Sequence, residues 1–172
     1  MKKRTMKTIP QDVIKEAVDK AIADYLNRNS YRRHLNETSS KVITLYHGGD
    51  CNDDLFYHGE IWLTDEPWYA YIYAKDKQNP CIWKIQVDES ILNLAGISEL
   101  GDYFDPYDGI DEETRAFLDE NQYDGYSFPI EWNGYYTDCT VLKDKEKILS
   151  VTAASQQEYK KIRNYFEREI GD

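Results

Sequence analysis

The feature that most constrains this chain is a series of short β-type segments between residues 41 and 152. Their residues are mainly β-branched and aromatic, which suits a half-buried strand better than a helix. Alternation is clearest in Trp83, Ile85 and Val87, whose side chains would share one face of a strand. The expected strands are Val42 to Tyr46, Ile61 to Thr64, Ile82 to Val87, Tyr126 to Pro129, Tyr135 to Leu142 and Ile148 to Thr152.

Helical patterns separate these strands. Helices are expected over Glu66 to Lys75 and Glu112 to Asn121. Ser155 and Glu158 form a capping box before a C-terminal helix. Short strands interleaved with helices predict an α+β fold.

The N-terminal residues carry a separate helical signal. Thr8 and Gln11 form a capping-box pattern, and apolar residues follow at helical spacing before a polar stretch. We therefore expect an N-terminal helix and linker over residues 1–40 and a main domain over residues 41–172. A chain of 172 residues is long enough to bury one core without a further domain.

The net charge of the chain restricts the classes of partner that it can bind tightly. A formal net charge of −11 at pH 7 disfavours tight binding to nucleic acid or to an anionic membrane, because phosphate binding draws on Lys and Arg. A basic protein, for example a host protein, is the favoured macromolecular partner, and a nucleic-acid target is less favoured. No apolar stretch is long enough to span a bilayer, so no membrane partner is expected.

The cysteines indicate a compartment. Cys51, Cys81 and Cys139 are odd in number and form no CxxC pair, which suits a reducing environment better than a disulfide framework. We expect them to be small core residues. The protein is expected to be soluble and cytoplasmic, or to act in a host cytoplasm.

Two segments form the candidate site. His47 follows an apolar strand, where a neutral imidazole could donate to a ribose hydroxyl, and Gly48 leaves the backbone open to a flat amide. Trp62 and Tyr73 could stack on a nicotinamide ring, at roughly 0.5 to 1.5 kcal/mol beyond area burial. Each residue also has a structural alternative, which is a histidine at a strand-ending turn or an aromatic ring in the core.

Cleavage of an N-glycosidic bond needs a carboxylate, because the transition state resembles an oxocarbenium cation. Asp138 and Glu131 are the candidates. Asp138 would project from the entrance of the apolar strand Cys139 to Leu142, and Glu131 lies in the expected turn Glu131 to Gly134. The alternative for both is a surface acid.

These residues together resemble the ADP-ribosyltransferase superfamily, in the branch that diphtheria toxin shares with poly(ADP-ribose) polymerases. Tyr46-His47-Gly48 is similar to the first motif, whose His binds a ribose of NAD and whose Gly binds the nicotinamide amide. The segment Gly59 to Asp65 resembles the second, with Trp62 at the signature Tyr, and Tyr73 stands at the second stacking Tyr. The segment Asp138 to Leu142 resembles the third, which a Glu opens in the family.

The resemblance implies a split β-sheet core and NAD as substrate. It implies mono-ADP-ribosyl transfer to a macromolecule, most naturally a protein. Small phage-encoded and bacterial members, including anti-CRISPR proteins that modify a Cascade subunit, look most similar in size. Catalytic roles are implied for Asp138, Glu131 and His47, and NAD binding for His47, Gly48, Trp62, Thr64 and Tyr73.

The sequence departs from the family at three positions. Trp62 replaces the signature Tyr, and Ala70 stands where polymerase-type members have a Ser that bonds the nicotinamide carbonyl. Asp138 is one methylene shorter than Glu, and a misplacement of about 1 Å can cost on the order of 10²-fold in rate. Poly(ADP-ribose) synthesis is therefore not expected.

An acidic segment lies outside these motifs. Asp102, Asp105, Asp108 and Asp111 recur every three residues, which is not the ligand spacing of an EF-hand. A solvated acidic loop is favoured over a calcium site, and we expect no metal site. The charge also supports another function class, in which a non-enzymatic acidic inhibitor blocks a basic nucleic-acid-binding surface. A third possibility keeps the transferase fold as an inactive binding scaffold.

Overall fold

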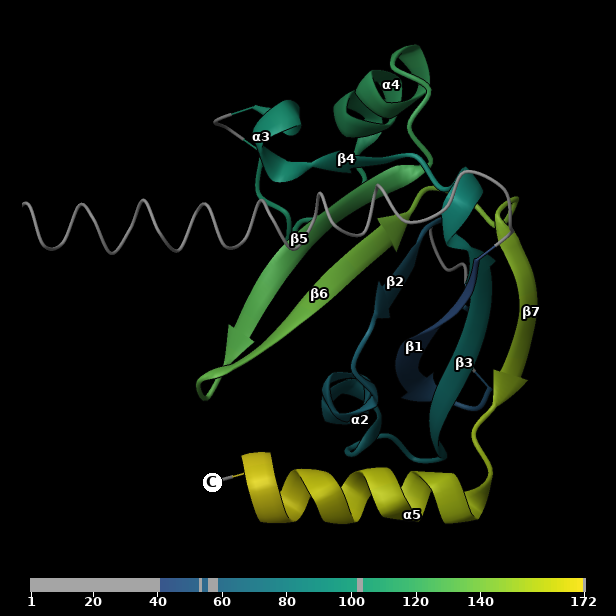
Figure 1. The fold of residues 1–172 in the computed structure, drawn as a ribbon, viewed down its shortest axis with the longest axis vertical. Helices are drawn as coiled ribbons and strands as arrows, with labels where there is room; N and C mark the ends of the chain where they lie inside the picture. Colours follow the sequence, from purple (N-terminus) through teal and green to yellow (C-terminus); the bar gives the residue numbers. More distant parts are fainter. Residues whose placement is uncertain (1–40, 53, 56–58, 102–103, 172) are drawn as a thin grey trace, which may run out of the picture. The chain divides into compact units, whose positions relative to one another are not determined.

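A computed structural model describes residues 41–52, 54–55, 59–101 and 104–171 of the chain. The N-terminal helix and linker expected over residues 1–40 lie outside these residues. The described strands form one seven-stranded sheet in the order β4-β5-β6-β2-β1-β3-β7 (Figure 1). Neighbouring strands pair antiparallel except β4 and β5, which are parallel.

The strands confirm the α+β expectation and extend it. Every expected strand is present. The structure also contains a short strand, β4, which was not predicted from its three residues. The bounds are β1 Val42–Asp50, β2 Ile61–Thr64, β3 Pro80–Asp88, β4 Leu94–Gly96, β5 Gly125–Trp132, β6 Tyr135–Leu142 and β7 Ile148–Ala153.

The helices expected after residue 41 are present, and the two with predicted bounds end within one residue of them. Asp111 caps α4 by accepting the Thr114 N–H at 2.7 Å, and Ser155 caps α5 by accepting the Glu158 N–H at 3.3 Å. The described helices are α2 Pro67–Ala74, η2 Glu89–Ile91, α3 Ile97–Leu100, α4 Glu112–Glu120, α5 Gln156–Tyr165 and the π-helical turn η3 Phe166–Ile170.

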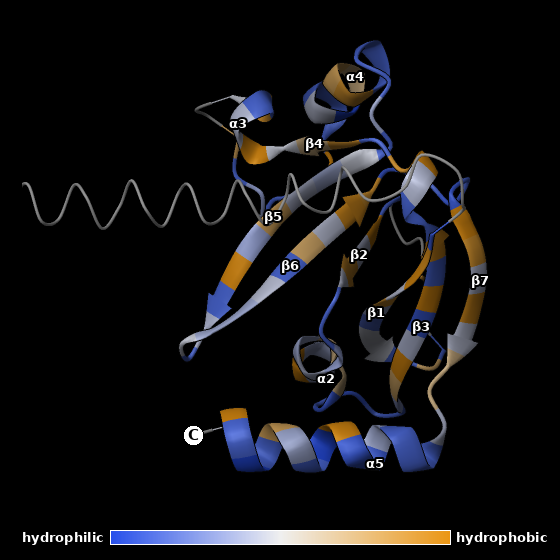
Figure 2. Cartoon of the chain, in the orientation of Figure 1, coloured by the Kyte–Doolittle hydropathy of each residue, from blue (hydrophilic) through white to orange (hydrophobic). Residues whose placement is uncertain are grey.

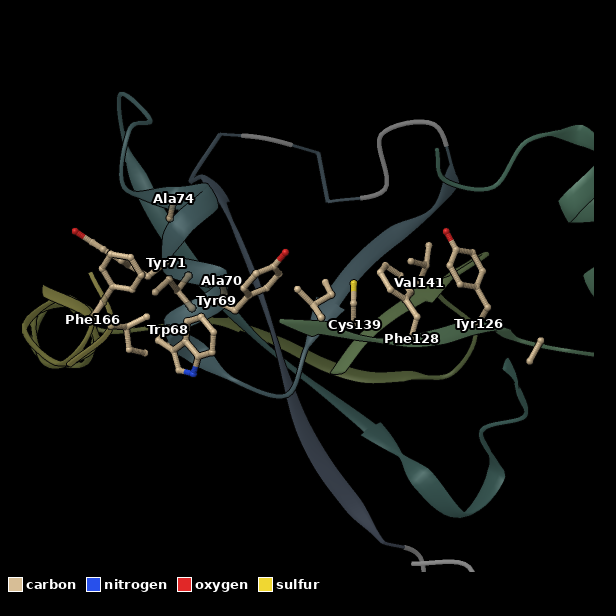
Figure 3. Packing of buried hydrophobic residues seen from close by; sticks show 14 of the residues in the cluster. Trp68, Tyr69, Ala70, Tyr71, Ala74, Tyr126, Phe128, Cys139, Val141 and Phe166 are labelled. Carbon is tan, nitrogen blue, oxygen red and sulfur yellow. The ribbon is translucent and has the colours of Figure 1, made fainter. Parts of the chain in front are cut away.

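Buried apolar side chains form two clusters. One includes α2 residues, Phe128 and Tyr126 of β5 and Cys139 of β6, and Figure 3 shows it running from the helix to these strands. The other includes Leu45 of β1 and Ile85 of β3. Helix α5 is mostly hydrophilic with hydrophobic bands (Figure 2). Its apolar residues Tyr159 and Ile162 pack against the first cluster, as expected for an amphipathic helix.

The structure contradicts the expected positions of Cys51 and Glu131. Cys51 is exposed rather than in the core, because it lies just beyond β1, whereas Cys81 and Cys139 are buried. Glu131 belongs to β5 and not to a turn, because Asn133 and Gly134 alone, with φ of 50° and 80°, make the two-residue hairpin turn. Within the part of the chain that the structure describes, no helix has the length and apolar character to cross a membrane.

Glu158 ties α5 to the sheet. Its carboxylate accepts from Lys84 Nζ of β3 at 2.8 Å and from the Ser155 N–H at 2.8 Å. The hydrogen bond from Lys84, followed by those from Ser155, lowers the pKa of Glu158 to about 2. The folded protein therefore favours the charged form of this side chain.

Replacing Glu158 with Gln is expected to lower the Tm at neutral pH. Because the folded pKa is depressed, the charged side chain stabilises the fold above its ordinary pKa of 4.5, and this contribution is lost as pH falls through about 2. The difference in Tm between wild type and Glu158→Gln should therefore narrow as pH falls. Thermal unfolding at a series of pH values from 7 to 2 measures this difference in Tm. Glu146→Gln, in an exposed turn, is the control. A difference that stays constant down to pH 2 would contradict the assignment.

Candidate functional site

A pocket with a volume of about 340 Å³ lies among β1, β2, β5, β6, α2 and the segment before α4. This volume falls within the roughly 300 to 1,000 Å³ range of small-molecule sites, which are mostly apolar with a few polar groups. Its described lining residues are Tyr46, His47, Gly48, Trp62, Leu63, Thr64, Tyr69, Ala70, Tyr73, Tyr107, Ile130 and Cys139.

All the residues predicted to bind NAD line this pocket. Strands β1 and β2 each supply two of them and helix α2 supplies the last, so separate elements bring them to one cavity. They are His47, Gly48, Trp62, Thr64 and Tyr73.

His47 lies inside β1 and not at its end, because β1 continues to pair with β3 as far as Asp50. Its Nδ1 lies 2.8 Å from the carbonyl oxygen of Trp62. A carbonyl oxygen only accepts, so we assign the hydrogen to Nδ1, which makes Nε2 an acceptor in the neutral ring. A neutral His47 would therefore accept a hydrogen bond from a ribose hydroxyl rather than donate one.

Gly48 faces helix α2 rather than forming an open turn. A Cβ at this position would lie 1.7 Å from the carbonyl oxygen of Ala70. The helix backbone can approach the strand only because Gly48 has no side chain. Tyr73 also lines the pocket and lies one helical turn beyond Ala70. The close approach of Ala70 to Gly48 therefore determines how near Tyr73 lies to strand β1.

Aromatic rings form the walls of the pocket. Tyr69 and Tyr73 meet edge to face, with centroids 5.5 Å apart and hydroxyl oxygens 3.1 Å apart. Trp62 meets the Phe128 ring edge-on at 6.3 Å, and Tyr107 meets the same ring at 5.3 Å. Burial, and then the hydrogen bond with Tyr73, raise the pKa of Tyr69, so its phenol is protonated at neutral pH. These walls suit a flat ring.

A hydrogen-bond chain runs behind Thr64. Thr137 donates its hydroxyl to Asp65 Oδ1 at 2.6 Å, so Thr64 must be the donor in its 2.7 Å contact with Thr137. Thr64 Oγ1 also accepts the Glu66 N–H at 3.2 Å. Asp65 Oδ1 accepts a second bond, from the Asp138 N–H at 3.0 Å. Two hydroxyl groups therefore connect the pocket wall to the carboxylate of Asp65.

The two acids predicted from the sequence project from the opposite face of the β5–β6 hairpin. Asp138 and Glu131 are next to Cys139 and Ile130, which line the pocket, and successive strand residues point to opposite faces. Glu131 is exposed, and its carboxylate accepts from the Tyr136 hydroxyl at 3.0 Å. None of the described lining residues is acidic.

Cys139 occupies the position of β6 that faces the pocket beside Thr64, its partner across the β2–β6 ladder. Burial, and then the charges of Asp138 and Asp65, raise the pKa of the Cys139 thiol to about 12. A protonated thiol is a weak nucleophile. We therefore regard Cys139 as part of the wall and not as a reactive group.

Sequence reasoning missed several lining residues. Tyr69 lies in a helix so rich in aromatic residues that its pattern does not show which ring faces the pocket. Tyr107 lies in the acidic segment, where no periodicity indicates a site. Asp105 and Asp108 of this segment are exposed, and among the described residues no group of three His, Cys, Asp or Glu side chains could hold a metal ion.

Comparisons of this chain with protein-family models, with curated proteins and with solved structures found no match.

Proposed function

We propose that the pocket binds the nicotinamide end of NAD and that the protein is a mono-ADP-ribosyltransferase with a split β-sheet core of that superfamily. The observation that carries the proposal is that all the residues predicted to bind NAD line one pocket. A second observation supports it. Strands β1 and β2 share a single register pair, Tyr46 with Thr64, and both of these residues line the pocket, so the ladder between the two strands is short where the pocket lies.

The proposed reaction exchanges one bond at the anomeric carbon of the nicotinamide ribose. The N-glycosidic bond breaks, and nicotinamide leaves with the electron pair. An acceptor nucleophile on the target then bonds to the same carbon and releases its proton. Trp62 and Tyr73 would hold the leaving ring, and His47 would accept a ribose hydroxyl hydrogen bond.

The surroundings of the pocket favour a basic protein as acceptor. Tyr107 lines the pocket, and the neighbouring Asp105 and Asp108 are exposed carboxylates on the same segment. Opposite charges steer association and set orientation more than they add affinity. A target with Lys or Arg beside its modified residue would therefore be oriented toward the pocket.

A second candidate function is an NAD-binding scaffold without transfer activity. The specific observation in its favour is that Asp138 and Glu131 project away from the pocket and that no described lining residue is acidic. The carboxylate of Asp65 is connected to the pocket wall by hydrogen bonds through Thr137 and Thr64. The transferase proposal therefore assigns stabilisation of the cation to Asp65.

Labelled NAD and a host lysate distinguish the two functions. The wild-type protein is expected to release nicotinamide and to label a lysate protein by the mass of one ADP-ribose. Asp65→Asn should lower both signals by on the order of 10² to 10³-fold, the usual loss when a group that stabilises transition-state charge is removed.

Glu131→Gln is the control, because it removes an exposed carboxylate on the face of the β5–β6 hairpin that points away from the pocket. NAD binding is measured for every variant, so that a collapsed pocket is not mistaken for lost catalysis. NAD binding without nicotinamide release in the wild type would favour the scaffold. Wild-type protein that does not bind NAD would exclude both functions.

A further inference from the structure

Glu60 connects two parts of the pocket that are distant in sequence. Its Oε1 accepts the indole N–H of Trp62 at 2.8 Å, and its Oε2 accepts the backbone N–H of Ile110 at 2.6 Å. Glu60 is partly buried and is not among the residues that line the pocket. It therefore acts on the pocket through Trp62 and through the segment that precedes α4.

The fold makes room for this carboxylate at Gly109. A Cβ on Gly109 would lie 2.6 Å from Oε1 of Glu60, and the φ of Gly109 is +83°, a conformation that favours glycine. Gly109 is itself buried. Both its backbone conformation and its missing side chain are thus needed for the observed place of Glu60.

The segment that Glu60 holds also supplies a wall of the pocket. Tyr107 lines the pocket three residues before Ile110, and the hydroxyl of Tyr126 donates to the Pro106 carbonyl at 3.0 Å. Trp62 and Tyr107 both meet the edge or face of one ring, Phe128. Glu60 therefore joins the two sides of an aromatic enclosure.

We propose that Glu60 is a positioning residue that fixes the plane of the Trp62 ring against the segment 104–111 and thereby sets the affinity of the pocket for a flat ring ligand. The identity of the ligand as the nicotinamide end of NAD rests on the function proposed above. The position of Trp62 does not depend on it.

The chemistry of the contact requires a carboxylate. Both partners of Glu60 are N–H donors, and an ionised carboxylate presents an acceptor to each. Glutamine has nearly the same shape, but one of its two terminal atoms is an NH₂ group that can only donate. Glu60→Gln therefore places a donor against either Trp62 or Ile110.

The first experiment follows the indole N–H groups by ¹H–¹⁵N NMR in the protein without ligand. The chain has 4 Trp, so Trp62→Phe identifies the Trp62 signal by its disappearance. Glu60→Gln is expected to shift that signal. Asp111→Asn, which removes one carboxylate from the end of the same segment while keeping a helix-capping side chain, should leave it in place. An unmoved Trp62 signal in Glu60→Gln would overturn the proposal.

The second experiment is a double-mutant cycle for the binding of NAD and of free nicotinamide. Glu60→Gln is expected to weaken both by on the order of tenfold, the scale of one lost hydrogen bond to a charged group. Because Glu60 acts through the indole N–H, Glu60→Gln in a Trp62→Phe protein should lower the affinity for each ligand by less than about threefold. Equal losses in the two backgrounds would show that Glu60 does not act through Trp62, which would overturn the proposal.

The two experiments separate this inference from the proposed function. If the wild-type protein binds neither NAD nor nicotinamide, the proposed function fails, and the NMR shift still decides whether Glu60 positions Trp62. A shifted signal then supports the positioning role, and an unshifted signal removes it.

Discussion

Replacing Gly48 with Ala is expected to lower the free energy of unfolding by roughly 3 kcal/mol or more, which is the range of severe core overpacking. The added Cβ would lie 1.7 Å from the carbonyl oxygen of Ala70. That atom belongs to the backbone of helix α2, so no side-chain rotation can relieve the clash. The helix must move away from β1, which also removes Tyr73 from its place in the pocket.

Gly96→Ala is the matched control. A Cβ at Gly96 would lie 3.6 Å from Glu99 Oε2, which is ordinary van der Waals contact, and the φ of Gly96 is −81°. We expect this variant to stay within about 1 kcal/mol of the wild type, as is usual for substitutions that create no clash. Urea unfolding measures both. If Gly48→Ala were as stable as Gly96→Ala, the close packing of α2 on β1 would be wrong.

Replacing Tyr73 with Ala is expected to weaken NAD binding by on the order of ten- to a hundredfold, because a stacking ring contributes its buried area and about 0.5 to 1.5 kcal/mol beyond it. Tyr73 lines the pocket and is 53% exposed. Its removal leaves the core intact, so the Tm should change little. Calorimetric titration with NAD and a thermal melt of the same sample measure the two effects together.

Tyr136→Ala is the control for this variant. Tyr136 is 71% exposed and lies on the face of the β5–β6 hairpin that points away from the pocket. The same chemical change at this position should alter NAD affinity by less than about twofold, since surface substitutions away from a site usually have small effects. Similar losses in Tyr73→Ala and Tyr136→Ala would remove the pocket as the NAD site.

The strands were predictable because each carries its own signal. Trp83, Ile85 and Val87 alternate along β3, and the whole of Tyr135–Leu142 formed as expected. Strand β4 was not predictable, because three residues are too few to show a period. Its pairing with β5 is a contact between distant segments, which local propensity does not encode.

The direction in which Asp138 projects could not be predicted from the sequence motif. The sequence placed Asp138 beside an apolar run but not on a particular face of it. Register decides the face, since a shift of one residue moves every side chain of a strand to the other side. The pairing of Thr64 with Cys139 turns Cys139 toward the pocket and Asp138 away from it.

The sequence by itself determined most of the elements and the predicted NAD-binding residues around the pocket, because strand alternation, helix caps and the segments Tyr46-His47-Gly48 and Gly59 to Asp65 are local patterns. Only the tertiary structure decided what those residues face. The approach of Ala70 to Gly48, the carboxylate of Glu60 between Trp62 and Ile110, and the outward direction of Asp138 all depend on contacts between segments far apart in the chain. Such contacts follow from packing and register, which no single segment specifies.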